Sequence, residues 1–184
     1  ATGYILLVSL GRFWGLNWPG MKFVLGEMTV WWFRVLSVGA GAIGLLAISG
    51  LSGRGIWVRR TEIRPLLVCT VFAILGWHIF TGYGVSLMPA GRASIIAFTM
   101  PVWAALLSSL LLGEPLTRYK IAGLVLGCAG LGVLLGPDPA VLETAPLGAL
   151  FMLLAALSWA LAPVLFKKHA WQSSVSTVLG SQLA

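Results

Sequence analysis

The stretch Trp14-Gly15-Leu16-Asn17-Trp18-Pro19-Gly20-Met21-Lys22 decides the fold, because it places polar groups inside an otherwise apolar segment. It contains an amide, two indoles, a proline and an ammonium group. A related stretch follows downstream, Trp159-Ala160-Leu161-Ala162-Pro163-Val164-Leu165-Phe166-Lys167, with the same separation between Trp and Lys. The recurrence predicts an internal repeat.

The composition around these stretches is that of a membrane protein. Of 184 residues, 59% are hydrophobic and only 9% are charged, and the apolar residues form long blocks with charges at their edges. A bilayer-spanning helix needs about 20 apolar residues. The pattern predicts an all-α polytopic membrane protein in contact with lipid. The net charge is +7, and the basic residues that cause it flank the apolar blocks. The positive-inside rule predicts this placement for a membrane protein, so the charge does not indicate a nucleic-acid partner and we expect none.

The apolar blocks predict six membrane spans and a partial seventh. The six spans are approximately 4–25, 29–51, 65–87, 93–112, 118–135 and 147–166, and the partial one is 175–184. The chain begins without Met and its last residues look like the opening of a further span, so we expect it to be part of a longer protein. Cys69 and Cys128 lie in apolar runs and predict helix packing instead of a disulfide.

The basic residues predict the orientation. Of the 12 Lys and Arg residues, eight fall on one side of the alternating spans. These eight are Arg54, Arg59, Arg60, Arg64, Arg118, Lys120, Lys167 and Lys168. Lys22, Arg34 and Arg92 fall on the other side, and Arg12 lies within the first span. Because Lys and Arg are enriched on the cytoplasmic side, the N-terminus is predicted to be cytoplasmic.

Five spans separate Trp14 from Trp159, so the second copy of the stretch is predicted to enter the membrane upside down. Inverted repeats occur in secondary transporters, whose substrate site lies near the midplane where interrupted helices of the two halves meet. Pro19 and Pro163 occupy nearly corresponding places. We predict that both break their helices, as Pro101 breaks the fourth span. For Pro19 the open alternative is a kink that neighbouring groups tolerate.

Several motifs resemble the EamA-type drug/metabolite transporters. They are Trp14 to Asn17 with Lys22, Trp32-Phe33-Arg34, Gly91-Arg92-Ala93-Ser94, Thr99-Met100-Pro101-Val102-Trp103 and Gly113-Glu114-Pro115-Leu116-Thr117. The resemblance implies a ten-helix fold of two inverted five-helix repeats that moves small metabolites by alternating access, without a bound cofactor. Residues 4–136 then form the first repeat, 137–146 an extracytoplasmic connector, and 147–184 the start of the second repeat.

The resemblance also places the opening stretch on the substrate path, which makes Trp14, Asn17 and Trp18 candidates for substrate binding. For Asn17 an interhelical hydrogen bond is the open alternative. Lys22 and Arg34 lie near the predicted outer boundary and either attract an anionic substrate or snorkel to lipid phosphates.

His78 lies near the middle of the third predicted span and titrates near physiological pH. It is a candidate for proton coupling or substrate binding, with a packing role as the alternative. Tyr83, Thr99 and Trp103 are candidates for lining a cavity, although such side chains also serve helix packing. We expect no metal site, because His78 has no potential ligand nearby in sequence.

The leading functional hypothesis is an exporter of amino acids or similar metabolites in the bacterial cytoplasmic membrane. No Asp or Glu falls inside a predicted span, which favours neutral, zwitterionic or anionic substrates. The alternative is a non-transporting scaffold that assembles through Gly123-x-x-x-Gly127 and Gly132-x-x-x-Gly136, faces that also suit a homodimer. An enzyme is not expected, because no nucleophile lies in a recognisable catalytic motif.

Overall fold

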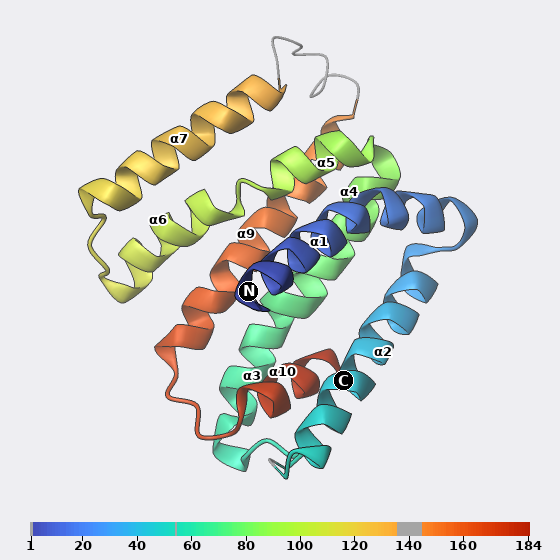
Figure 1. The fold of residues 1–184 in the computed structure, drawn as a ribbon, viewed down its shortest axis with the longest axis vertical. Coiled ribbons are helices and arrows are strands. Elements are labelled where there is room, and N and C mark those ends of the chain that lie inside the picture. The colour runs from blue at the N-terminus through green and yellow to red at the C-terminus, as the bar shows by residue number, and fades with distance from the viewer. Residues whose placement is uncertain (1, 54, 136–144) are drawn as a thin grey trace.

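A computed structural model describes residues 2–53, 55–135 and 145–184, and these residues form helices and connectors without a strand (Figure 1). The predicted all-α class is therefore confirmed. The elements are α1 (Thr2–Glu27), α2 (Val30–Leu51), the 3-10 helix η1 (Arg60–Glu62), α3 (Ile63–Thr70), the π-helix η2 (Val71–Gly76), α4 (Trp77–Leu87), α5 (Ala90–Ala97), α6 (Met100–Leu112), α7 (Arg118–Leu135), α9 (Pro146–Lys168) and α10 (Val175–Leu183).

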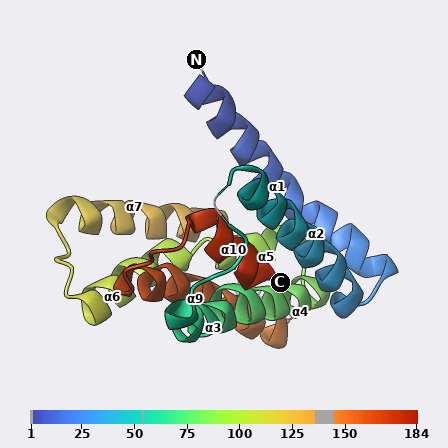
Figure 2. The ribbon, with the colours of Figure 1, turned by 90° about the horizontal axis from the view of Figure 1, so that it is seen from below.

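Helix α9 is the centre of the packing. It contacts α4, α5 and α6, and in Figure 1 it lies between the α6–α7 pair and α4. Its buried face carries small side chains, including Ala155, Ala156 and Ala160, around the fully buried Met152. Small residues let membrane helices approach closely. The N-terminal half of α1, by contrast, projects away from the other helices (Figure 2), and its apolar side chains are exposed.

The third predicted span forms one helical run from Arg60 to Leu87 that contains a π-helix at Val71–Gly76. The Ser158 hydroxyl of α9 donates a hydrogen bond of 2.8 Å to the Phe72 carbonyl within this segment. Gly76 lies directly against Ser158, where a Cβ atom would come within 3.0 Å of the Ser158 Cβ atom. π-Helical turns inside α-helices are frequent at functional sites, and this one ends immediately before Trp77 and His78.

The three prolines behave differently. Helix α5 ends at Ala97 and α6 begins at Met100, so the fourth predicted span departs from regular helix just before Pro101. Helices α1 and α9 instead continue through Pro19 and Pro163, which corrects the breaks expected there. A proline removes one intrahelical hydrogen bond, and membrane helices tolerate this loss because neighbouring groups satisfy the freed carbonyl.

Among the residues that the structure describes, four helical stretches are long and apolar enough to cross a membrane. They are Val30–Leu51, Arg60–Leu87, Ala90–Leu112 and Pro146–Lys168. Helix α1, which contains Arg12 and Asn17, and helix α7 are not among them. The count of six spans therefore stays a prediction.

Connectors that were predicted to share a side of the membrane do lie together. Glu62, which is 2% exposed, accepts hydrogen bonds from the Ser173 hydroxyl and from the backbone of Gln172. Glu114 pairs with Lys120 at 3.2 Å and with Lys167. These contacts bring the start of the Arg60–Leu87 run and the 113–117 and 169–174 connectors to the same side of the bundle.

Two of the acidic residues that the sequence places between predicted spans lie at helix ends. Glu27 is the last residue of α1, and Glu62 belongs to the helical run that starts at Arg60. Residues 136–144, which make up most of the predicted acidic connector, and Arg54 of the basic loop lie outside the described residues.

We predict that Gly76→Ala destabilises the protein by about 1–3 kcal/mol, because the new methyl group would overpack the contact with Ser158. Unfolding of the full-length protein in detergent measures the effect. Gly127→Ala is the matched control, since a Cβ atom at Gly127 meets nothing within 4 Å. A helical Gly→Ala change without a clash stabilises by about 0.5–1 kcal/mol. Equal shifts for both variants would contradict the packing argument.

The Glu114 cluster predicts a pH-dependent stability. Hydrogen bonds from Lys167, Ser108 and Lys120 lower the pKa of Glu114 from 4.5 to about 2. The stabilisation is therefore complete above pH 4.5 and is lost as the pH falls from 4.5 through about 2.

We expect wild type to melt above Glu114→Gln near neutral pH and the difference to disappear in this acidic window. Glu27→Gln, which removes an exposed carboxylate outside the cluster, serves as the control. A difference that stays constant with pH would show that the ion pairs do not cause it.

Candidate functional site

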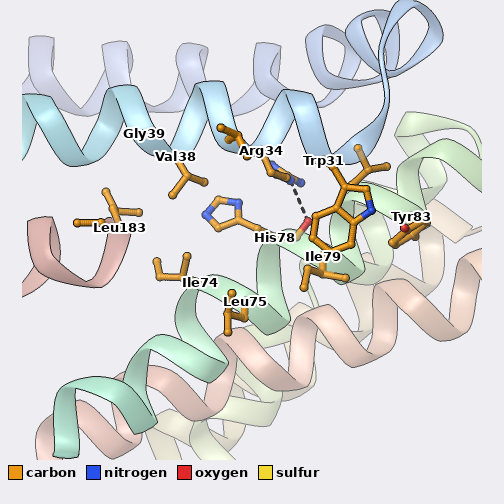
Figure 3. Close-up of a pocket in the computed structure, with 13 residues that line it drawn as sticks. Trp31, Arg34, Val38, Gly39, Ile74, Leu75, His78, Ile79, Tyr83 and Leu183 are labelled. Atoms are coloured by element: carbon orange, nitrogen blue, oxygen red, sulfur yellow. Dashed lines mark hydrogen bonds between the residues drawn. The ribbon is translucent and has the colours of Figure 1, made fainter. Parts of the chain in front are cut away.

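Arg34 turns inward from α2 and connects three helices. Its Nε atom donates a hydrogen bond of 2.8 Å to the His78 carbonyl of α4, as Figure 3 shows, and its Nη2 atom donates one of 2.7 Å to the Thr81 hydroxyl. The same Nη2 atom lies 3.2 Å from the sulfur of Met21 in α1. Both interpretations of Arg34, attraction of an anionic substrate and snorkelling to lipid phosphates, stay predictions. Among the described residues, no Asp or Glu pairs with Arg34.

His78 borders three cavities. The α1 cavity, between α1, α2 and α4, has a volume of 320 Å³. The α2 cavity, between α2, the η2–α4 segment and the end of α10, has a volume of 360 Å³ (Figure 3). The α9 cavity, lined by residues of α3, η2, α9 and α10, has a volume of 560 Å³. The His78 Nδ1 atom is buried without a hydrogen-bond partner among the described residues.

Aromatic side chains from α1, α4 and α9 form a continuous wall beside this histidine. The rings of Trp14 and Trp159 meet edge to face with centroids 6.4 Å apart, and those of Trp77 and Trp159 lie 5.1 Å apart. Trp18 contacts Trp77 at 6.5 Å and Phe98 at 6.1 Å. Trp18 is 4% exposed, and its indole Nε1 has no hydrogen-bond partner among the described residues.

The structure brings most of the candidate residues together. Trp14, Asn17, Trp18, Arg34 and His78 all line the α1 cavity. Tyr83 joins Arg34 and His78 around the α2 cavity. Residues from the first, second and third predicted spans therefore share one site.

Lys22, Thr99 and Trp103 line none of the three cavities. The Lys22 ammonium donates hydrogen bonds of 2.8 Å and 3.0 Å to the carbonyls of Val85 and Ser86. It thus satisfies carbonyl groups at the C-terminal end of α4, where a positive charge is favourable. The Trp103 indole donates to the Thr99 hydroxyl at 3.1 Å. A substrate role for these three residues stays a prediction.

The sequence analysis missed Thr81, Trp77 and Trp159. Thr81 lies three residues after His78 on one helix, a spacing that places both on the same face, so a search for polar neighbours of His78 would have found it. Trp159 was recognised as a repeat marker, but nothing in the sequence indicated that it would line a cavity. Within residues 2–53, 55–135 and 145–184, no group of three His, Cys, Asp or Glu could hold a metal ion.

Residues 1–136 match the EamA-like transporter family. The chain belongs to this family. Two similar proteins are uncharacterized transporters of Bacillus subtilis strain 168: YoaV is 28% identical over 94% of this chain, and YvbV is 32% identical over 96% of it. The chain spans 63% and 59% of the lengths of these relatives.

A third relative has a named substrate class. The aromatic amino acid exporter YddG of Ancylobacter novellus is 36% identical over 97 residues, which are 52% of this chain and 33% of that protein. No solved structure matches the chain. Family membership and the apolar helices together describe a multi-pass membrane protein related to transporters of small molecules.

Proposed function

We propose that the protein is a secondary transporter that exports amino acids or similar small metabolites across the cytoplasmic membrane by alternating access. The observation that carries the proposal is the position of His78, which borders all three cavities between the helices. A transport path needs polar groups that a substrate meets in turn, and Arg34, Asn17 and Tyr83 flank His78 on two sides. The exporter relative supports the substrate class and the direction.

The proposal includes the ten-helix architecture, with residues 4–136 as the first repeat, 137–146 as the connector and 147–184 as the start of the second. The contact between Trp14 and Trp159 supports it. Equivalent residues of two repeats related by a twofold axis meet each other where the axis passes close to them. The N-terminus is proposed to be cytoplasmic. The connectors richest in Lys and Arg lie together on one side of the bundle, and the positive-inside rule assigns that side to the cytoplasm.

The site residues have distinct proposed roles. Trp14, Trp18 and Asn17 contact the substrate from α1, and Arg34 and Tyr83 contact it from α2 and α4. His78 is the candidate for proton coupling, because it lies between the cavities.

We predict that His78→Ala lowers saturable amino-acid flux about tenfold or more, equivalent to about 1.4 kcal/mol in the barrier. Flux is measured in proteoliposomes that contain the full-length protein. Arg12→Gln is the control, because Arg12 is an exposed cation of α1 that lines none of the cavities. Wild-type flux in the His78→Ala protein would refute the site assignment.

The scaffold alternative is supported by helix α7. A Cβ atom added at Gly123, Gly127, Gly130 or Gly132 meets nothing within 4 Å, so the described residues leave this glycine surface unpacked. If the protein assembles partners through it, Gly123→Leu with Gly127→Leu should abolish assembly, as measured by crosslinking in membranes. The His78→Ala variant should then assemble normally. Unchanged crosslinking in the leucine variant would exclude the scaffold function.

A further inference from the structure

We infer that the α1 cavity recognises a carboxylate through Arg34, and that its substrates are small carboxylic acids with an apolar or aromatic side group. The inference names the substrate class of the proposed transport site and so rests on the proposed function. It depends on three observations, which concern charge, hydrogen-bonding capacity and the cavity walls.

The first observation is an uncompensated charge. Arg34 is partly buried between α1, α2 and α4, and its hydrogen-bond partners are a carbonyl, a hydroxyl and a thioether, which are all uncharged. Its guanidinium also lies over the Phe33 ring, 4.9 Å from the ring centroid, which is a further uncharged contact. Removing a cation from water is costly unless a counter-charge or several hydrogen bonds replace the water. No described carboxylate pairs with Arg34. An anionic ligand would supply the missing negative charge.

The second observation is unused hydrogen-bonding capacity. A guanidinium has five N–H donors, and the contacts of Arg34 involve only Nε and Nη2. Both N–H groups of Nη1 therefore remain for a ligand, and Arg34 lines both the α1 and the α2 cavities. Trp18 also lines the α1 cavity, and its Nε1 atom has no hydrogen-bond partner in the part of the chain that the structure describes. A carboxylate suits these donors because it offers about four acceptor positions and no donor.

The third observation concerns size and surroundings. The α1 cavity has a volume of 320 Å³ and is lined by Phe13, Trp14, Trp18 and Trp77. Ligand cavities range from about 300 to 1,000 Å³, so this one suits a molecule of amino-acid size. The indole surfaces suit an apolar or aromatic group, and their faces also attract an ammonium group. The cavity can therefore accept both amino acids and simple aromatic acids, provided that each carries a carboxylate.

The test compares acids with their own amides. L-Phenylalanine, L-leucine and 3-phenylpropionate, and the primary amide of each, are titrated into the full-length protein in phosphatidylcholine nanodiscs. Hydrogen bonds to a charged group contribute about 1.5–3 kcal/mol, which corresponds to a preference of about 10-fold to 100-fold. We expect the acids to bind tighter than their amides by this factor. Inorganic phosphate is titrated as a second anion and should bind more weakly than the acids.

Three variants assign the preference. Arg34→Gln should reduce the ratio of acid to amide affinity to about one, and Arg34→Lys should keep part of it. Arg12→Gln removes a cation from α1 outside the cavity and should keep the full ratio. Thermal unfolding and circular dichroism check that each variant is folded. The wild-type ratio is itself decisive, so the result does not depend on the folding of Arg34→Gln.

Equal binding of acids and amides by wild type, binding of none of the acids, tighter binding of phosphate, or an unchanged ratio in a folded Arg34→Gln protein would each overturn the inference. Counterflow in proteoliposomes tests transport separately. Equal flux of acids and amides would support transport and refute carboxylate recognition. Arg34-dependent acid binding without flux would support carboxylate recognition and refute transport.

Discussion

The hydrogen bonds of the partly buried Arg34 guanidinium are the interaction on which the arrangement of the first three helical runs depends. A cation at this depth needs oxygen and sulfur partners, and they come from α4 and α1. The partners fix α2 against α4 at one height. Gly82 makes this approach possible, because a Cβ atom there would collide with Val30 and would lie 3.6 Å from Arg34 Nε. One charge therefore determines both a helix contact and the polar centre of a cavity.

The position of His78 depends on the π-helix that precedes it. The π-helix at Val71–Gly76 changes the direction in which the following side chains point. Ser158 of α9 stabilises this segment, because it packs against Gly76 and its hydroxyl donates a hydrogen bond to the Phe72 carbonyl. Helix α9 thus positions a residue of the third helical run. Since α9 also contributes Trp159 to the aromatic wall, the proposed substrate site includes groups from both proposed repeats.

Much of the architecture was predictable because hydrophobic blocks and charge positions are local properties. The boundaries of α2, α9 and the run ending at Leu87 lie close to those expected. The prolines were less predictable: Pro101 follows a real interruption, whereas α1 and α9 absorb Pro19 and Pro163. Whether a helix continues through a proline depends on how the surrounding helices satisfy its free carbonyl, and no local pattern reports that.

The sequence by itself determined the all-α membrane class, the order of the helices and the resemblance to the EamA-like family, because hydropathy, charge and short motifs are written along the chain. It also indicated five candidate site residues, which are Trp14, Asn17, Trp18, Arg34 and His78. Only the tertiary structure decided which of the candidates share a cavity. Arg34 is separated from His78 by 44 residues and from Thr81 by 47, and Lys22, equally prominent in sequence, binds carbonyls of α4 instead. Such pairings follow from the packing of whole helices, which no single segment encodes.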